Sequence, residues 1–128
     1  MTAPEGIKYT HDHEWVLRTS EDTVRIGITE YAQQQLGDVV FVQLPDVGDS
    51  IESGSGVGEV ESTKSVSDLY APVTGEVVAR NEQLDSQPEL VNSDPYGEGW
   101  MLDVKLSDPS APDELLDEDA YRNIIDQG

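Results

Sequence analysis

The apolar residues of this chain fall into short runs, rich in valine and isoleucine, that are separated by clusters of turn-forming residues. Runs of roughly four to eight β-branched and aromatic residues, bounded by glycine, proline, aspartate and serine, are typical of strands in small β-proteins. A chain of 128 residues can bury one modest core. We therefore predict a mainly β fold: a flattened hybrid of barrel and sandwich, built from two antiparallel sheets with short peripheral helices.

The strands can be placed from the same runs. The stretch 38–44 is nearly continuous in β-branched and aromatic residues, so we expect it to be buried on much of its surface. The stretch 23–28 alternates apolar and other residues, and strands at 7–10 and 14–19 are expected to pair with each other. The remaining strands are expected at 57–61, 67–72, 75–81 and 100–106.

Helices are expected only at the edges of this β framework. Thr29 has the position of an N-cap before a short helix at 30–36, and Gly37 is expected to end that helix. A single helical turn is expected at 89–92. The pattern changes after the last strand, where apolar residues recur at helical spacing through a C-terminal tail at 111–126.

Ser110 or Asp113 could cap the helix of this C-terminal tail. No composition shift or linker interrupts the chain, so we expect residues 1–128 to form a single domain.

The charge limits which partners the chain can have. Acidic residues outnumber basic ones by 27 to 7, for a formal net charge of −20. Nucleic acids and anionic membranes both require lysine and arginine, so we expect neither as a partner. The charge keeps copies of the chain apart, which predicts a monomer, and favours partners with basic surfaces. Adaptation to a salt-rich environment would also explain the acidity, and the sequence leaves that alternative open.

The chain has no cysteine, which excludes a disulfide framework, a thiolate metal site and a cysteine nucleophile. Any sulfur chemistry would therefore have to come from an attached group. The first ten residues lack the apolar segment of a secretory signal, and no apolar stretch reaches the length of a membrane span. We expect a soluble, cytoplasmic protein.

One lysine occupies an unusual position. Lys64 lies in a short hydroxyl-rich turn between two β-prone runs, within the stretch GEVESTKSVSDLYAPVTGEV. Two strands joined by so tight a turn form a β-hairpin, here at about 57–72, and Lys64 would stand near its tip. An exposed side chain on a rigid hairpin is accessible to another protein, although most exposed lysines only solubilise a surface.

Two other motifs carry less information. The glycines of GSGVG at 54–58 have the wrong spacing for a phosphate-binding loop, and a strand follows them where a helix is needed. His11 and His13 flank Asp12, but a complete metal site would need distant carboxylates, so we expect no metal. Two histidines so close together also support no Ser-His-Asp catalytic constellation.

The lysine hairpin resembles that of the glycine cleavage system H protein family. Its hallmark is Glu-Ser-x-Lys followed by Ser-Asp and Pro-x-x-Gly, matched here by Glu61, Ser62, Lys64, Ser67, Asp68, Pro72 and Gly75. Further stretches resemble the family in the same order, at 13–16, 27–45, 90–101 and near the C-terminus in AYRNII. Many family members have a histidine where this chain has Gln35.

The resemblance implies a carrier rather than an enzyme. It implies that lipoic acid is joined by an amide bond to Lys64, and that Glu61, Ser62 and Asp68 take part in recognition of the lipoyl hairpin. It also implies that Glu14 lines a surface cleft in which the loaded arm rests, where a carboxylate can hydrogen-bond the aminomethyl amine and help to exclude water. The residues alone are equally compatible with Glu14 as an exposed strand residue.

The same resemblance implies a set of partners. A pyridoxal-phosphate decarboxylase (P protein) would load the aminomethyl group of glycine, and a tetrahydrofolate-dependent aminomethyltransferase (T protein) would remove it. A flavin-dependent dihydrolipoamide dehydrogenase (L protein) would reoxidise the dithiol, and lipoyl-attaching enzymes would modify the lysine.

Four other functions compete with this carrier role. A biotinyl carrier would have Met-Lys-Met, whereas Lys64 lies between Thr63 and Ser65. The lipoyl domains of 2-oxoacid dehydrogenases have Asp-Lys-Ala and lack this C-terminal tail. A relay protein that donates lipoyl or octanoyl groups to other proteins remains the alternative function. An unmodified binding module is the fourth possibility.

Overall fold

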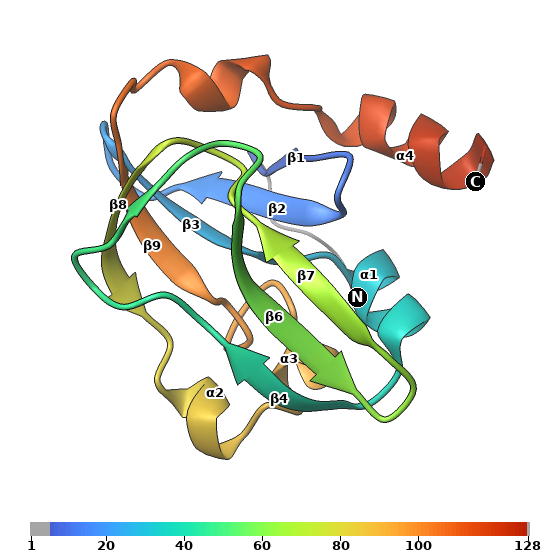
Figure 1. Cartoon of the computed structure of the whole chain (residues 1–128). Helices are drawn as coiled ribbons and strands as arrows, with labels where there is room; N and C mark the ends of the chain where they lie inside the picture. The colour runs from blue at the N-terminus through green and yellow to red at the C-terminus, as the bar shows by residue number, and fades with distance from the viewer. Residues whose placement is uncertain (1–5, 128) are drawn as a thin grey trace.

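The computed structural model describes residues 6–127 and contains two antiparallel sheets (Figure 1). The larger sheet has six strands in the order β1-β2-β3-β9-β8-β5: Lys8–Tyr9, Glu14–Arg18, Thr23–Ile28, Leu102–Leu106, Gly75–Arg80 and Ser50–Ile51. The smaller sheet has three strands in the order β4-β6-β7: Val39–Gln43, Gly56–Ser62 and Val66–Tyr70. The predicted mainly β fold with two antiparallel sheets is confirmed, and the sheets are not closed into a continuous barrel.

The helices are short and lie around the sheets (Figure 1). They are α1 (Glu30–Leu36), α2 (Gln83–Ser86), α3 (Leu90–Ser93), a 3-10 turn η1 (Ala111–Glu114) and α4 (Glu118–Gln127). Among residues 6–127, none of these helices is long and apolar enough to cross a lipid bilayer.

The core joins the two sheets. Each sheet presents alternate residues to it, such as Val16, Ile26 and Val104 from the larger sheet and Val42 and Val60 from the smaller one, all at most 2% exposed. A second cluster of Ile7, Tyr9, Trp15 and Tyr121 lies where α4 packs against the larger sheet. Burial of these side chains supplies most of the driving force that holds the sheets together.

Local sequence signals predicted several elements correctly. Strand β3 and helix α1 begin and end at the predicted residues. The Thr29 hydroxyl accepts a hydrogen bond from the backbone N–H of Ala32 at 3.2 Å, as expected of an N-cap. Gly37 ends the helix with φ +83°, a conformation that glycine adopts without steric cost.

The predicted burial of the stretch 38–44 is wrong. Strand β4 is shorter than predicted. Within it Val40, Phe41 and Gln43 are exposed while Val39 and Val42 face the core, and Leu44, which follows the strand, is also buried. The reason is that one face of β4 belongs to the outer face of the smaller sheet, which points away from the core, and that a bulge at Val40 adds a second exposed residue. Hydrophobicity alone reveals neither feature.

The C-terminal tail is helical in two pieces rather than one. Around Leu116 the chain is extended, because Leu116 and Tyr9 exchange two backbone hydrogen bonds of 2.8 and 2.9 Å. Asp117 then caps α4 by accepting a hydrogen bond from Ala120 at 2.8 Å. Ser110 precedes η1 but makes no capping hydrogen bond with its side chain. The two-residue strand β5 and the single-turn helix α2 were not predicted.

The glycine-rich stretch around Gly58 serves strand packing. A Cβ atom at Gly58 would overlap the backbone carbonyl oxygen of Gln43 on β4, whereas a Cβ at Gly56 would meet nothing within 4 Å. Gly58→Ala should therefore lower the free energy of unfolding by about 2 kcal/mol, because two backbones would be forced apart. Urea unfolding measures this loss, and Gly56→Ala is the matched control. Equal stabilities of the two variants would contradict this explanation.

Candidate functional site

The turn between β6 and β7 is held in one conformation by the Ser62 side chain. Its hydroxyl accepts hydrogen bonds from the backbone N–H groups of Lys64 at 3.2 Å and Ser65 at 3.0 Å, and donates to the Ser65 carbonyl at 3.1 Å. The N–H of Thr63 donates to the Asp38 carbonyl at 3.0 Å, which ties the turn to the segment between α1 and β4 (Figure 1). The turn therefore presents its lysine from a fixed backbone.

Lys64 is exposed at this turn, and none of the ion pairs formed among residues 6–127 includes it. The aliphatic part of its side chain passes over Gly37, where a Cβ atom would lie 2.8 Å from the Lys64 Cε. The absence of a side chain at Gly37 thus leaves room for the lysine stem. The geometry leaves the ammonium group accessible to a second protein.

A cleft of about 440 Å³ opens beside the hairpin. One wall comes from α1, a second from the end of the β1–β2 turn, and a third from β7, which begins two residues after Lys64. The lining residues are Asp12, His13, Glu14, Ile28, Tyr31, Ala32, Gln35, Leu36, Val60, Ser65, Val66, Ser67, Asp68 and Leu69. The mixture of apolar and carboxylate side chains suits a ligand with a long apolar body and a cationic end.

Glu14 is the most unusual residue in this cleft because its carboxylate is buried, with only 2% of the residue exposed. Its Oε2 accepts a hydrogen bond from the Tyr70 backbone N–H at 2.9 Å, while Oε1 is buried without a partner among the described residues. Burial raises the pKa of Glu14 from 4.5 to about 8, the Tyr70 hydrogen bond opposes this rise, and Asp12 adds to it. A buried oxygen without a hydrogen bond is costly, so this position favours a ligand that can donate one.

The neighbouring His13 connects the cleft to the C-terminal helix. It has φ +64°, in the left-handed region, and its Nδ1 lies 2.9 Å from the Tyr121 hydroxyl. That hydroxyl also lies 2.7 Å from the Thr29 Oγ1, and Thr29 caps α1. Burial lowers the pKa of His13 and raises that of Tyr121 to about 12, which favours the neutral forms of both. Helix α4 thus braces two walls of the cleft.

Comparison with known proteins agrees with this geometry. Residues 7–128 match the model of the family described as glycine cleavage H-protein. The chain is 61% identical over 125 residues to the glycine cleavage system H protein of Mycolicibacterium smegmatis, covering 95% of each chain. The chain belongs to the glycine cleavage H-protein family. A member from Mycobacteroides abscessus is 59% identical over 127 residues, covering 96% of this chain and 97% of that protein.

A solved structure within the H-protein family shows the same fold. The crystal structure of a glycine cleavage system H protein from Mycobacterium marinum superposes with a TM-score of 0.85 at 44% sequence identity. The match covers 94% of this chain and 96% of that one. The two-sheet architecture around the hairpin is therefore shared across nearly the whole chain.

The structure brings together some of the residues that sequence analysis singled out from the H-protein resemblance. Glu14 and Asp68 line the same cleft, although they are 54 positions apart in the chain. Ser62 organises the turn that carries Lys64. Glu61 is not part of the cleft lining and pairs across the sheet with Phe41 and Val66.

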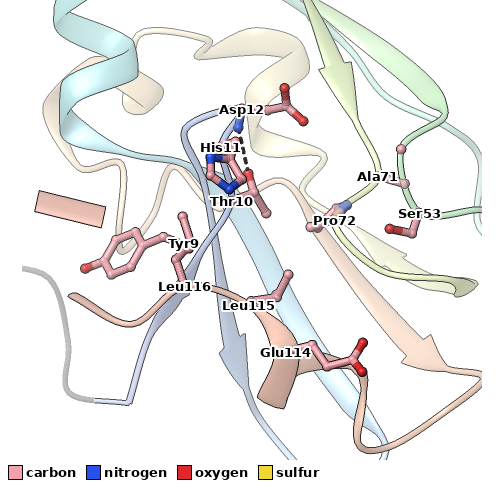
Figure 2. Close-up of a pocket in the computed structure, with 11 residues that line it drawn as sticks. Tyr9, Thr10, His11, Asp12, Ser53, Ala71, Pro72, Glu114, Leu115 and Leu116 are labelled. Atoms are coloured by element: carbon pink, nitrogen blue, oxygen red, sulfur yellow. Dashed lines mark hydrogen bonds between the residues drawn. The ribbon is translucent and has the colours of Figure 1, made fainter. Parts of the chain in front are cut away.

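Sequence reasoning missed the link from Tyr121 to His13 and Thr29, because a hydrogen bond across 108 positions leaves no local pattern. It also missed a smaller pocket of about 220 Å³ that shares Asp12 with the cleft. Figure 2 shows this pocket enclosed by the turn at 10–12, Ala71 and Pro72, and the extended segment around Leu116. Segments so distant in the sequence come together only in the folded H-protein domain.

Proposed function

We propose that Lys64 carries lipoic acid in amide linkage and that the chain carries the aminomethyl group and electrons of glycine cleavage between separate enzymes. Membership of the H-protein family identifies a carrier protein rather than an enzyme. The observation that carries the proposal is an exposed lysine on a fixed turn, directly beside a cleft that contains a buried carboxylate oxygen without a partner in the described part of the chain.

The residues present fit such a group. The exposed Lys64 Nζ can displace the leaving group of an activated lipoate, lose a proton and form the amide bond. The cleft volume of about 440 Å³ falls in the range of roughly 300–1,000 Å³ usual for small-molecule sites. When bound, lipoic acid supplies a disulfide that accepts two electrons together with the aminomethyl group.

Glu14 is proposed to receive the amine that such an arm presents. Its Oε1, which has no partner between residues 6 and 127, can accept a hydrogen bond from a protonated primary amine, and the approaching positive charge favours the ionised carboxylate. Asp68 lines the same cleft and adds negative charge near its opening. Ile28, Leu36 and Leu69 supply apolar lining that limits the access of water to the bound amine.

The proposed partners are the enzymes that act in turn on the arm: the decarboxylase, the aminomethyltransferase and the dihydrolipoamide dehydrogenase. Lipoyl-attaching enzymes act earlier, on the unmodified lysine. We propose that the chain acts as a monomer. The net charge of −20 favours partners with basic docking surfaces, because charge complementarity speeds encounter without requiring a long-lived complex.

The function is tested by glycine–bicarbonate exchange with purified glycine decarboxylase. The lipoylated chain should support the exchange, and the unmodified chain should not. A lipoylated chain that fails to support exchange but transfers its acyl group to other lipoyl domains would instead favour the relay function.

Ser62→Ala should slow the lipoylation of Lys64. The substitution removes the hydroxyl that holds the Lys64 and Ser65 backbone N–H groups, so the lysine would no longer be presented in one conformation. We expect kcat/KM for a lipoate ligase to fall about tenfold, with a loss of about 1 kcal/mol in stability. Ser65→Ala is the control, because Ser65 contributes only backbone groups to these bonds. Equal kinetics for both variants would disprove this role of Ser62.

A further inference from the structure

The outer face of the smaller sheet, beside the lysine turn, combines exposed apolar side chains with carboxylates. In the first row from the turn, Phe41, Glu61 and Val66 lie opposite one another on β4, β6 and β7. In the next row, Gln43, Glu59 and Asp68 lie opposite one another on the same three strands. The opposite face of these strands holds the buried residues Val42, Val60 and Leu69, so both rows face away from the core. Val66 and Asp68 also border the cleft, because they lie on the edge strand β7.

The bulge in β4 adds a second apolar side chain to this face. The pairing passes from Val39 to Phe41, so Val40 is the extra residue. Val40 is 53% exposed, Phe41 48% and Val66 53%. These are three of the five large apolar side chains that are exposed among the described residues. Bulges redirect side chains, and this one places two apolar groups together where strict alternation would separate them.

The same face carries uncompensated negative charge. Glu59 lies directly across from Asp68, an arrangement of like charges that destabilises a sheet. None of the ion pairs among residues 6–127 involves Glu59, Glu61 or Asp68. The Tyr70 hydroxyl, at 3.4 Å from Asp68, provides only a weak hydrogen bond. A cation from outside the chain would relieve this repulsion.

We propose that this face, formed by Val40, Phe41, Glu59, Glu61, Val66 and Asp68, is the docking surface for the enzyme that acylates Lys64. The inference rests on the proposed function. The partner surface that fits has a lysine or arginine surrounded by apolar side chains, so that the cation meets Glu59 and Glu61 while Phe41 enters an apolar pocket. Because the Phe41 row directly precedes the turn, a protein that reaches Lys64 meets this row first.

Charge complementarity favours this occupant over a second copy of the chain. Two copies that met through this face would bring six carboxylates together, in molecules that already carry a net charge of −20 each. A complex with a basic partner would instead be stabilised in two ways, by attraction between opposite charges and by removal of the exposed aromatic ring from water. This combination is typical of interface hot spots.

The test is the rate of lipoylation by a purified lipoate–protein ligase, with lipoate and ATP, measured against the concentration of the full-length chain. Val40→Thr and Phe41→Thr should each raise KM about tenfold and leave kcat unchanged, because they remove docking contacts but not the lysine. Val78→Thr is the matched control: Val78 is 41% exposed and is the extra residue of the bulge in β8. Thermal unfolding of all three variants confirms that they are folded.

The outcomes separate the inference from the function on which it rests. If Val40→Thr and Phe41→Thr behave like Val78→Thr while the native chain is fully lipoylated, the docking surface is disproved and the carrier function stands. If the native chain gains no lipoyl group, both fail. If sedimentation shows that the native chain dimerises and Phe41→Thr is monomeric, the face joins two copies and the inference is overturned.

Discussion

Lys64→Arg will abolish glycine–bicarbonate exchange after treatment with lipoate ligase, while the native chain treated in the same way will support it. Arginine keeps the positive charge and the long exposed side chain at the tip of the hairpin, but its guanidinium does not form the amide bond. Because Lys64 is exposed and forms no ion pair with a described residue, the fold should not change. A free energy of unfolding within about 0.5 kcal/mol of that of the native chain, measured by thermal unfolding, would confirm this.

The matched control is Lys105→Arg. Lys105 is an exposed lysine within strand β9 rather than at a turn, and its replacement should leave the exchange unchanged. Retention of exchange activity in Lys64→Arg, or its loss in Lys105→Arg, would place the attachment site elsewhere.

Glu14→Gln will become more stable than the native chain as pH rises from about 4.5 to 8. Below this window the Glu14 carboxyl is protonated in both the folded and the unfolded chain. Within the window the unfolded chain releases the proton and the folded chain retains it, because burial raises the pKa of Glu14 from 4.5 to about 8. Ionisation therefore draws the native chain toward the unfolded state, and a neutral glutamine does not.

The expected difference in the free energy of unfolding reaches up to about 5 kcal/mol at pH 8 and above, since each pKa unit corresponds to about 1.4 kcal/mol. Urea unfolding of both proteins at several pH values measures it. Glu76→Gln, which replaces an exposed carboxylate on β8, is the control. If the difference in the free energy of unfolding between Glu14→Gln and the native chain does not change with pH, the assignment of a buried carboxyl at position 14 is contradicted.

The sequence was informative where structure depends on neighbouring residues. The helix from Glu30 to Leu36 could be predicted because Thr29 and Gly37 are local capping signals. The lysine turn could be located because small polar residues interrupt two β-prone runs. The hairpin residues all lie between positions 56 and 70, so their proximity in the fold follows from their proximity in the chain.

The sequence was less informative where structure depends on contacts between segments that are far apart in the chain. The pattern of β4 predicts a strand buried on much of its surface, yet the outward-facing side of the smaller sheet and the bulge expose Val40 and Phe41. The burial of Glu14 was equally hidden, since it depends on β7, which supplies the Tyr70 N–H from 56 positions away. Residue type predicts a polar strand position, whereas desolvation depends on what packs against it.

Intact-mass measurement of the full chain after incubation with lipoate, ATP and a lipoate–protein ligase, followed by peptide mapping, tests the assignment of Lys64 most directly. The chain contains only three lysines, Lys8, Lys64 and Lys105, so the mapping distinguishes every side-chain candidate. We predict one added lipoyl amide, located on Lys64 and absent from Lys64→Ala. No mass gain on the native chain, or a lipoyl group on Lys8 or Lys105, would contradict the proposed carrier site.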